Sequence, residues 1–314
     1  DKVDRAWAEE ALSFPGVSAL LREVAPANPV LVHRTRSAFV KAFAKHCVVP
    51  LKNALETCEK ESHAAKDAGE AYDIDEKQTA RRSLRAYCLA ALASLDVESA
   101  KAVDFDGAAV LRAAYDGAQN MTETVSVLNA LAKVDMSARG DDANGVLRAT
   151  FKRFLETWKD DANVSCTYLS SVAQLSAYVS DAVADDANQN ESANINPALA
   201  NVSAVCENVR DEFSNVYDAK VPNKFYALIG GFARGNVCGF HALDGRGYDF
   251  VVDKLLEMDK INAIAASRLA KPFTEWRLYD PRRALMMRLC LEKILAAKPS
   301  PNMFEICTKS LAAE

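Results

Sequence analysis

Apolar residues recur at helical spacing along nearly all of this 314-residue chain, and this periodicity is the feature that most constrains its fold. Leu84, Cys88, Leu92 and Leu95 belong to one stripe at intervals of three and four residues, as on one face of an α-helix. Similar stripes run through residues 147–158 and 199–213. No convincing stretch alternates with the period of two that a half-buried β-strand requires. The sequence therefore predicts an all-α protein.

Cap and turn residues mark the expected helix boundaries. Asp280-Pro281 and Ser300-Pro301 each place a capping side chain before a proline at the first helical position, and residues 120–123 resemble a capping box. Residues 14–16 and 244–247 mark breaks. A long series of amphipathic helices with short connections packs as a bundle or as a stack of helix pairs. Because the helix spacing is unequal, we expect an irregular superhelical array of helix pairs, like HEAT or armadillo solenoids, over residues 1–314.

Composition and charge exclude several classes of protein. Half of the residues are hydrophobic and 26% are charged, which is typical of a folded chain. The net charge of -5 argues against nucleic-acid binding, and no apolar run is long enough for a membrane helix. We therefore expect neither a nucleic acid nor a membrane as a partner. The basic cluster of Arg81, Arg82 and Arg85 is expected on a solvated helix face. The polar stretch at residues 185–196 is expected to be a mobile loop.

The cysteines indicate the redox compartment. The chain has eight cysteines and no Cys-x-x-Cys pair, and most of them lie within apolar helical patterns, where a free thiol behaves as a small hydrophobic side chain. Scattered spacing of this kind is typical of a reducing compartment rather than of a disulfide framework. We therefore expect a cytoplasmic location.

The residues alone carry no catalytic signature. None of the four histidines, His33, His46, His63 and His241, is followed by Glu or lies four residues from another histidine, as a His-Glu-x-x-His zinc site requires. Neither a nucleophile elbow nor a phosphate-binding loop is present. A Cys–His nucleophilic pair stays open, because such partners meet only in space. On these grounds the chain would be a helical scaffold or binding module.

Ordered motifs in residues 222–311 add a resemblance to a known family. The segments 225–233, 240–248, 276–283 and 304–311, together with Ala266-Ser267-Arg268-Leu269, follow one another as in the C-terminal end of the aminopeptidase N family, in its bacterial-type alanyl aminopeptidase branch. Upstream, residues 79–89 and 118–123 also resemble family motifs. The likeness is strongest from residue 222 onward and moderate before it.

This resemblance implies the C-terminal helical domain of a zinc aminopeptidase that removes N-terminal residues from peptides. The domain would enclose the active-site chamber and contact the peptide tail, with the protein's own catalytic domain and peptide substrates as partners. No catalytic residue, metal ligand or cofactor is then expected in this chain, because the zinc belongs to a catalytic domain outside it, and the chain alone would be inactive. The family's first helices would also be missing, which predicts an uncovered apolar face at Val3, Trp7, Ala11 and Leu12. A free-standing helical-repeat scaffold that binds a protein partner is the alternative.

The resemblance also implies a substrate-binding set. Two family arginines face the chamber, and one of them is retained as Arg268. The other falls in a motif that here runs through Asn223, Lys224 and Tyr226, where Lys224 and Tyr226 replace the two arginines of the motif. A tyrosine supplies neither the charge nor the bidentate fork of a guanidinium, so carboxylate recognition would be weaker or rearranged. The alternative for Arg268 is an ordinary structural ion pair.

Overall fold

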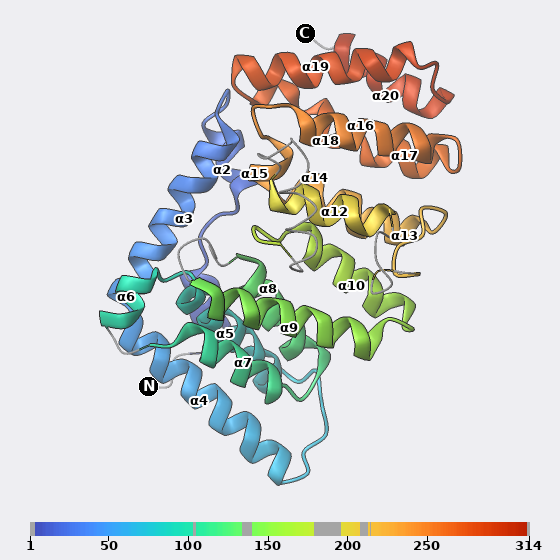
Figure 1. Ribbon diagram of the computed structural model, residues 1–314. Helices are drawn as coiled ribbons and strands as arrows, with labels where there is room; N and C mark the ends of the chain where they lie inside the picture. Colours follow the sequence, from blue (N-terminus) through green and yellow to red (C-terminus); the bar gives the residue numbers. More distant parts are fainter. Residues whose placement is uncertain are drawn as a thin grey trace. The chain divides into compact units, whose positions relative to one another are not determined.

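A computed structural model describes residues 4–102, 105–133, 140–178, 196–207, 213 and 215–312. Within these ranges the chain consists of helices and their connections, and no β-strand is present beyond an isolated parallel bridge between Ala27 and Tyr279 (Figure 1). The predicted all-α class is therefore confirmed. The stretch at residues 185–196, predicted to be a mobile loop, lies outside the described residues up to Asn196.

The helices form two compact units. Unit 1 comprises Asp1–Pro15 and Arg36–Phe154, and unit 2 comprises Gly16–Thr35 and Leu155–Glu314. Two helices, α3 (Pro29–His46) and α9 (Gly140–Trp158), have residues in both units.

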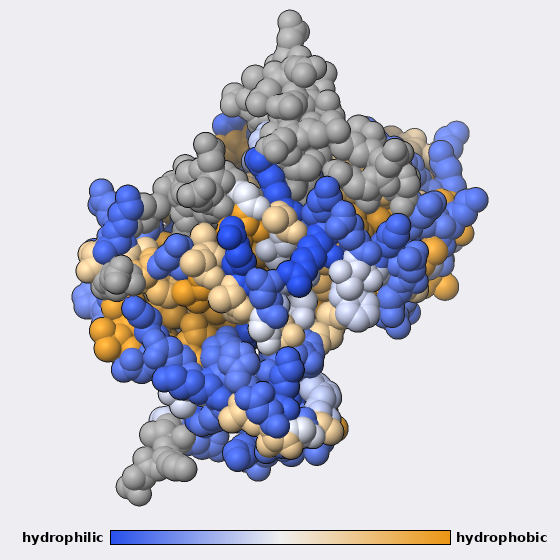
Figure 2. Space-filling model, turned by 60° about the horizontal axis from the view of Figure 1, so that its bottom comes forward, coloured by the Kyte–Doolittle hydropathy of each residue, from blue (hydrophilic) through white to orange (hydrophobic). Residues whose placement is uncertain are grey.

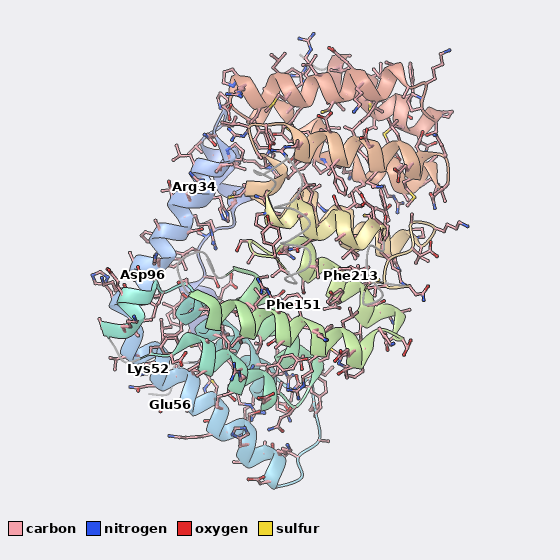
Figure 3. All side chains as sticks on the ribbon, in the orientation of Figure 1. Arg34, Lys52, Glu56, Asp96, Phe151 and Phe213 are labelled. Carbon is pink, nitrogen blue, oxygen red and sulfur yellow. The ribbon has the colours of Figure 1, made fainter. Side chains whose placement is uncertain are left out.

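Unit 1 is organised around a central helix. Besides parts of α3 and α9, its helices are α1 (Arg5–Leu12), α4 (Val48–Asp67), α5 (Glu76–Ala93), α6 (Val97–Ala102), α7 (Gly107–Asp116) and α8 (Met121–Lys133). Helix α5 contacts α1, α4, α7 and α8. The apolar stripe predicted from the sequence lies on its buried face, since Cys88 and Leu92 are almost completely buried, as is Leu95 just beyond the end of the helix. Phe151 on α9 is also fully buried, as predicted from its helical stripe (Figure 3).

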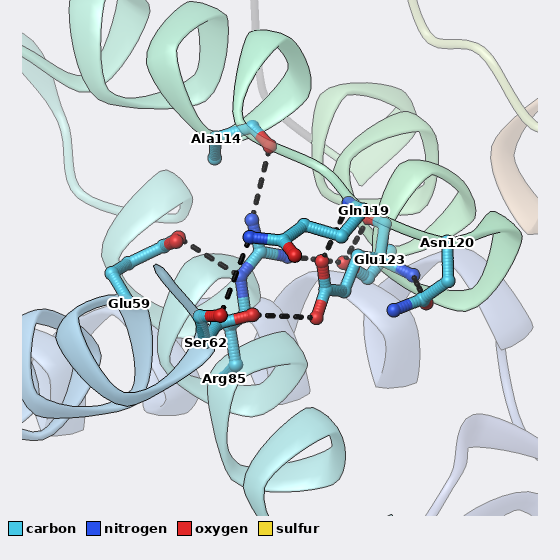
Figure 4. Close-up of polar contacts among 8 residues, drawn as sticks. Glu59, Ser62, Arg85, Ala114, Gln119, Asn120 and Glu123 are labelled. Atoms are coloured by element: carbon cyan, nitrogen blue, oxygen red, sulfur yellow. Dashed lines mark hydrogen bonds and ion pairs between the residues drawn. The ribbon is translucent and has the colours of Figure 1, made fainter. Parts of the chain in front are cut away.

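The arginines of α5 correct the prediction of a solvated face. Arg81, Arg82 and Arg85 are 9%, 6% and 1% exposed. Arg85 donates from Nε to Glu59 Oε1 at 2.9 Å and from Nη2 to the carbonyl oxygen of Ala114 at 3.0 Å, so that it connects α5 with α4 and α7 (Figure 4). A charge run in the sequence does not reveal acceptors on other helices, and these acceptors make the burial of a guanidinium tolerable.

Unit 2 contains many shorter helices. Besides parts of α3 and α9, they are α2 (Val17–Glu23), α10 (Ala162–Ala173), α12 (Pro197–Glu207), α13 (Pro222–Phe225), the π-helix η3 (Tyr226–Gly230), α14 (Gly231–Gly235), α15 (Val237–Phe240), α16 (Arg246–Asp259), α17 (Ala263–Leu269), α18 (Lys271–Thr274), the 3₁₀ turn η4 (Trp276–Leu278), α19 (Pro281–Ala296) and α20 (Pro301–Ala312). Helix α16 contacts α17 and α19, while α20 contacts α17 and α19.

The predicted caps are present at the last two helices. The side chain of Asp280 accepts a hydrogen bond from the Arg283 backbone N–H at 3.2 Å, and Pro281 is the first residue of α19. Ser300 precedes Pro301, and its Oγ accepts from the Met303 backbone N–H at 3.4 Å. A capping side chain satisfies backbone N–H groups that have no partner within the helix, which explains why these helices begin where the sequence predicts.

Aromatic rings fill the core of unit 2. Phe240 is fully buried, and its ring packs edge to face against those of Tyr248 and Phe273 at centroid distances of 5.0 and 5.5 Å. Phe213 is 2% exposed and adds to the apolar interior of this unit. Edge-to-face pairs stabilise a core beyond the area that they bury. Phe232 of α14 also packs edge to face against Phe240 at a centroid distance of 6.3 Å, so the core extends to that helix.

Polar side chains dominate the surface. On the face drawn in Figure 2, hydrophilic residues predominate and hydrophobic areas lie between them (Figure 2). Trp7 is 66% exposed and Ala11 is also exposed, whereas Leu12 is half-buried and Val3 lies outside the described residues.

All eight cysteines are free thiols. None of the helices in the described ranges is long and apolar enough to cross a membrane.

Candidate functional site

The predicted substrate-binding segment lies in a continuous helical stretch that widens into a π turn. Helix α13 begins at Pro222 after Val221, the π turn spans Tyr226–Gly230, and α14 continues to Gly235. The sequence predicts a helix here but not its π turn. Single π turns within helices frequently occur at functional sites.

Two adjacent glycines let this stretch approach its neighbours closely. A Cβ atom at Gly231 would lie 3.0 Å from the Cβ of Ala173 on α10, and one at Gly230 would lie 2.9 Å from Cδ1 of Leu269 on α17. A larger residue at Gly231 would press against α10, whereas at Gly230 the side chains of Arg234 and Leu269 would have to move aside. The glycine pair holds the π turn close to both α10 and α17.

Tyr226 connects the π turn to the helix that carries Arg268. Its side chain is half-buried, and its hydroxyl donates to the carbonyl oxygen of Ala265 on α17 at 3.2 Å. The carbonyl that accepts this bond is three residues before Arg268. The structure thus brings two of the four predicted residues to contacting elements.

Arg268 is available for a ligand. It is exposed in the last turn of α17, a helix capped by Asn262, whose side chain accepts from the Ala265 N–H at 2.9 Å. No hydrogen bond or ion pair joins the Arg268 guanidinium to another residue within the described part of the chain. The alternative of a structural ion pair therefore has no partner among those residues.

Lys224 and Asn223 have different surroundings. Lys224 Nζ donates to the carbonyl oxygen of Asn215 at 3.3 Å, and Asn215 itself has a positive φ of 66°. Asn223 is exposed. The hydrogen bond of Lys224 is therefore made to the turn at Asn215 and not to α17.

Arg234 is a further exposed cation beside the π turn that the motif comparison missed. Its Nη2 lies 2.6 Å from the point where a Cβ of Gly230 would stand, close to Leu269, the neighbour of Arg268. The guanidinium folds back over the space that Gly230 leaves, and the residue is exposed without a hydrogen-bond or ion-pair partner in the described ranges. The spacing 226, 230, 234 places these three residues along one helical face, a signal that was available in the sequence.

A buried polar network supports the motifs that carry the family resemblance. His241 Nδ1 lies 2.8 Å from the hydroxyl oxygen of Tyr248, and the His241 carbonyl oxygen accepts from Arg283 Nε at 2.8 Å. Burial and the nearby Arg283 lower the pKa of His241 to about 3, while Asp280 opposes this shift. The imidazole is thus neutral at ordinary pH. Among the described residues no group of three or more His, Cys, Asp or Glu could hold a metal ion.

One protein-family model matches almost the whole chain. Residues 1–312 match a family described as a domain of unknown function, DUF3458_C, with ARM repeats. The chain belongs to this family. The ARM repeats of the DUF3458_C family agree with the predicted array of helix pairs.

Curated relatives confirm the resemblance to aminopeptidase N. The chain is 25% identical over 313 residues to aminopeptidase N of Escherichia coli (strain K12), covering 99% of this chain and 30% of the relative. It is 27% identical over 313 residues to aminopeptidase N of Caulobacter vibrioides, covering 99% and 31%. The chain therefore spans about 30% of the length of these relatives and corresponds to their C-terminal part.

A solved structure shows the same fold. The crystal structure of Legionella pneumophila aminopeptidase A in complex with aspartic acid matches with a TM-score of 0.68 and 22% sequence identity, covering 98% of this chain and 32% of that one. At this identity the match supports the helical architecture alone.

Proposed function

We propose that this chain is the C-terminal helical domain of a zinc aminopeptidase that cleaves N-terminal residues from peptides. The similarity to two curated aminopeptidase N proteins over 99% of the chain supports this proposal. In this role the domain encloses the active-site chamber and contacts the distal end of the peptide. Its partners are the catalytic domain of the same protein and peptide substrates, and its location is the cytoplasm.

The zinc ion belongs to the catalytic domain. The chain has no His-Glu-x-x-His motif, and its described residues contain no cluster of metal-binding side chains. A hydrolytic zinc site needs three protein ligands and a base that activates water. The residues of this chain therefore contribute to substrate recognition and not to the hydrolytic step.

The arrangement around α17 is the main support for a role in recognising the peptide. Arg268 and Arg234 are exposed, and Tyr226 donates a hydrogen bond to the same helix that carries Arg268. An exposed guanidinium binds a carboxylate through charge-assisted hydrogen bonds. Arg234 supplies a second positive charge on the face where Tyr226 stands in place of the family arginine. The ligand is the free C-terminal carboxylate of a short peptide.

Steady-state kinetics on the full-length protein test this role. A charge-assisted hydrogen bond contributes about 1.5–3 kcal/mol when desolvated, and solvent in a chamber reduces this. Arg268→Ala should therefore raise KM for short free-acid peptides about threefold to tenfold, since about 1.4 kcal/mol corresponds to tenfold. Arg234→Ala should act in the same direction, and Tyr226→Arg in the opposite one. Matched peptide amides and single-residue reporter substrates should be nearly unaffected.

Arg288→Ala provides a matched control. Arg288 is an exposed arginine on α19 that pairs with Glu292 at 2.9 Å. This variant should leave KM for both kinds of peptide unchanged. Equal losses on free-acid and amide peptides after Arg268→Ala would assign Arg268 to the structure of the domain. If the full-length protein lacks both a His-Glu-x-x-His motif and peptidase activity, the scaffold alternative replaces the enzyme.

A further inference from the structure

Unit 1 contains a half-open polar cavity lined by residues of α4, α5 and α8. Its volume is about 70 Å³, and its lining includes Ser62 and Lys66 of α4, Arg81 of α5 and Glu123 of α8. A buried water needs on the order of 10–15 Å³ of such volume. The cavity therefore has room for several waters or for one small solute.

Arg81 lines this cavity as a largely buried cation, and the charge of the nearby Glu61 carboxylate, which is itself paired with Arg5, interacts with it. Arg81 is 9% exposed, and its Nη1 makes one long hydrogen bond, 3.4 Å, to the carbonyl oxygen of Glu61. Its Nε is buried and has no acceptor, and no carboxylate of the described residues lies within ion-pair distance of the guanidinium. A buried charge with a single long hydrogen bond is costly, so a further acceptor from outside the chain would stabilise this arrangement.

Glu123 gives the same cavity a buried negative charge. It is 4% exposed, and its two carboxylate oxygens accept from Ser62 Oγ at 3.2 Å and from the Gln119 N–H at 2.9 Å (Figure 4). Each oxygen accepts one bond here, and a carboxylate oxygen has lone pairs for a further donor. Lys66 and Glu70, at the exposed rim, add a second positive and a second negative charge. Neither has an ion-pair partner in the described part of the chain.

We propose that this cavity binds a small zwitterion of the α-amino-acid class. The carboxylate of the ligand accepts hydrogen bonds from Arg81 and Lys66, and its ammonium group donates to Glu123 and Glu70. A simple anion would bind Arg81 but would be repelled by the carboxylates of Glu123 and Glu70. A simple cation would bind these carboxylates but would be repelled by Arg81 and Lys66. The proposal rests on unit 1 alone and goes beyond the peptidase role.

Titration of the chain with three probes tests the proposal. Glycine carries both charges, acetate carries the carboxylate alone, and methylammonium carries the cation alone. Chemical shifts of the isotope-labelled chain should show saturable glycine binding with a dissociation constant on the order of 1 mM, since so few atoms limit the affinity. Acetate and methylammonium should each bind about tenfold more weakly or less, because each satisfies one half of the site.

Two rim variants test which residues hold the ligand. Lys66→Ala should weaken glycine binding about threefold or more, because it removes an exposed charge from the site without touching the core. Lys60→Ala is the matched control, since Lys60 is an exposed lysine of the same helix outside the cavity. Arg81→Lys and Glu123→Gln, checked by circular dichroism for an intact fold, should abolish saturable binding.

Three results would overturn the proposal. Shifts that never saturate at concentrations far above millimolar would show that the cavity holds water only. Acetate binding as tight as glycine would exclude a zwitterion. Equal glycine affinity in the wild type, Lys66→Ala and folded Arg81→Lys would place any binding elsewhere on the chain.

Discussion

At the scale of single residues, the surroundings of His241 decide its charge. The side chain is 5% exposed, and its imidazole lies between the Tyr248 hydroxyl and the Arg283 network. Burial first and Arg283 second lower its pKa from 6.5 to about 3. The unfolded chain binds a proton at this site below pH 6.5, while the folded chain does not. The stability that His241 contributes is therefore fully present above pH 6.5 and is lost as the pH falls toward 3.

Substitution of His241 should change how stability depends on pH. Between pH 7.5 and 5.0, the histidine should account for a loss of about 2 kcal/mol in the free energy of unfolding, from the linkage of one proton. His241→Gln should remove that part of the loss, whatever its effect at pH 7.5. Urea unfolding at both pH values measures the difference. A pH dependence of stability that His241→Gln leaves unchanged would contradict the buried neutral imidazole.

At the scale of elements, close backbone approach fixes how short helices of unit 2 pack. Gly247 lies at the start of α16, and a Cβ there would stand 2.5 Å from the carbonyl oxygen of Gly239 and 2.8 Å from that of Phe240. These backbone atoms belong to α15 and cannot turn aside as a flexible side chain does. Gly245, with φ of 77°, turns the chain into α16 just before this contact. Gly247 thus allows a close backbone contact, and Gly245 allows a positive φ.

The two kinds of helical glycine should respond oppositely to alanine. Gly247→Ala should lower the free energy of unfolding by about 1–3 kcal/mol or more, because overpacking shifts two helices. Gly145→Ala on α9 is the matched control, since a Cβ there would meet no atom within 4 Å. It should raise stability by about 0.5–1 kcal/mol through helix propensity. Chemical denaturation of both variants measures the two signs, and a neutral Gly247→Ala would argue against the close approach.

At the scale of the whole molecule, the chain covers about 30% of the length of its aminopeptidase N relatives. Its sequence has neither a His-Glu-x-x-His motif nor histidines at zinc-ligand spacing. Helical periodicity and the ARM-repeat family describe a scaffold of helix pairs, and such arrays present extended surfaces to partners. In the function that we propose, this surface contacts the catalytic domain and the peptide.

The chain on its own should be catalytically silent. We expect less than stoichiometric zinc after dialysis and no turnover of an alanyl reporter substrate, because three ligands and a base are needed for a hydrolytic zinc site. Metal analysis and the reporter assay, run beside the full-length protein as the positive control, measure both. A tightly held zinc ion together with turnover by the chain alone would refute this expectation.

The sequence by itself determined the helices and much of their boundaries. Apolar stripes such as that of Cys88 and Leu92 predict the buried face of α5, because a helix buries residues that recur every three or four positions. Asp280 and Pro281 predict the start of α19, because capping is a local interaction. The family motifs also led to Arg268 and Tyr226.

Only the tertiary structure decided which polar residues are buried and where the Arg234 guanidinium lies. Arg81, Arg82 and Arg85 look like a solvated cluster in the sequence, yet Arg85 is buried because Glu59 and the Ala114 carbonyl reach it from other helices. The position of the Arg234 guanidinium depends on a π turn and on the space over Gly230. Local spacing determines a helix, but burial and neighbours depend on residues far apart in the chain, and these meet only when the helices pack.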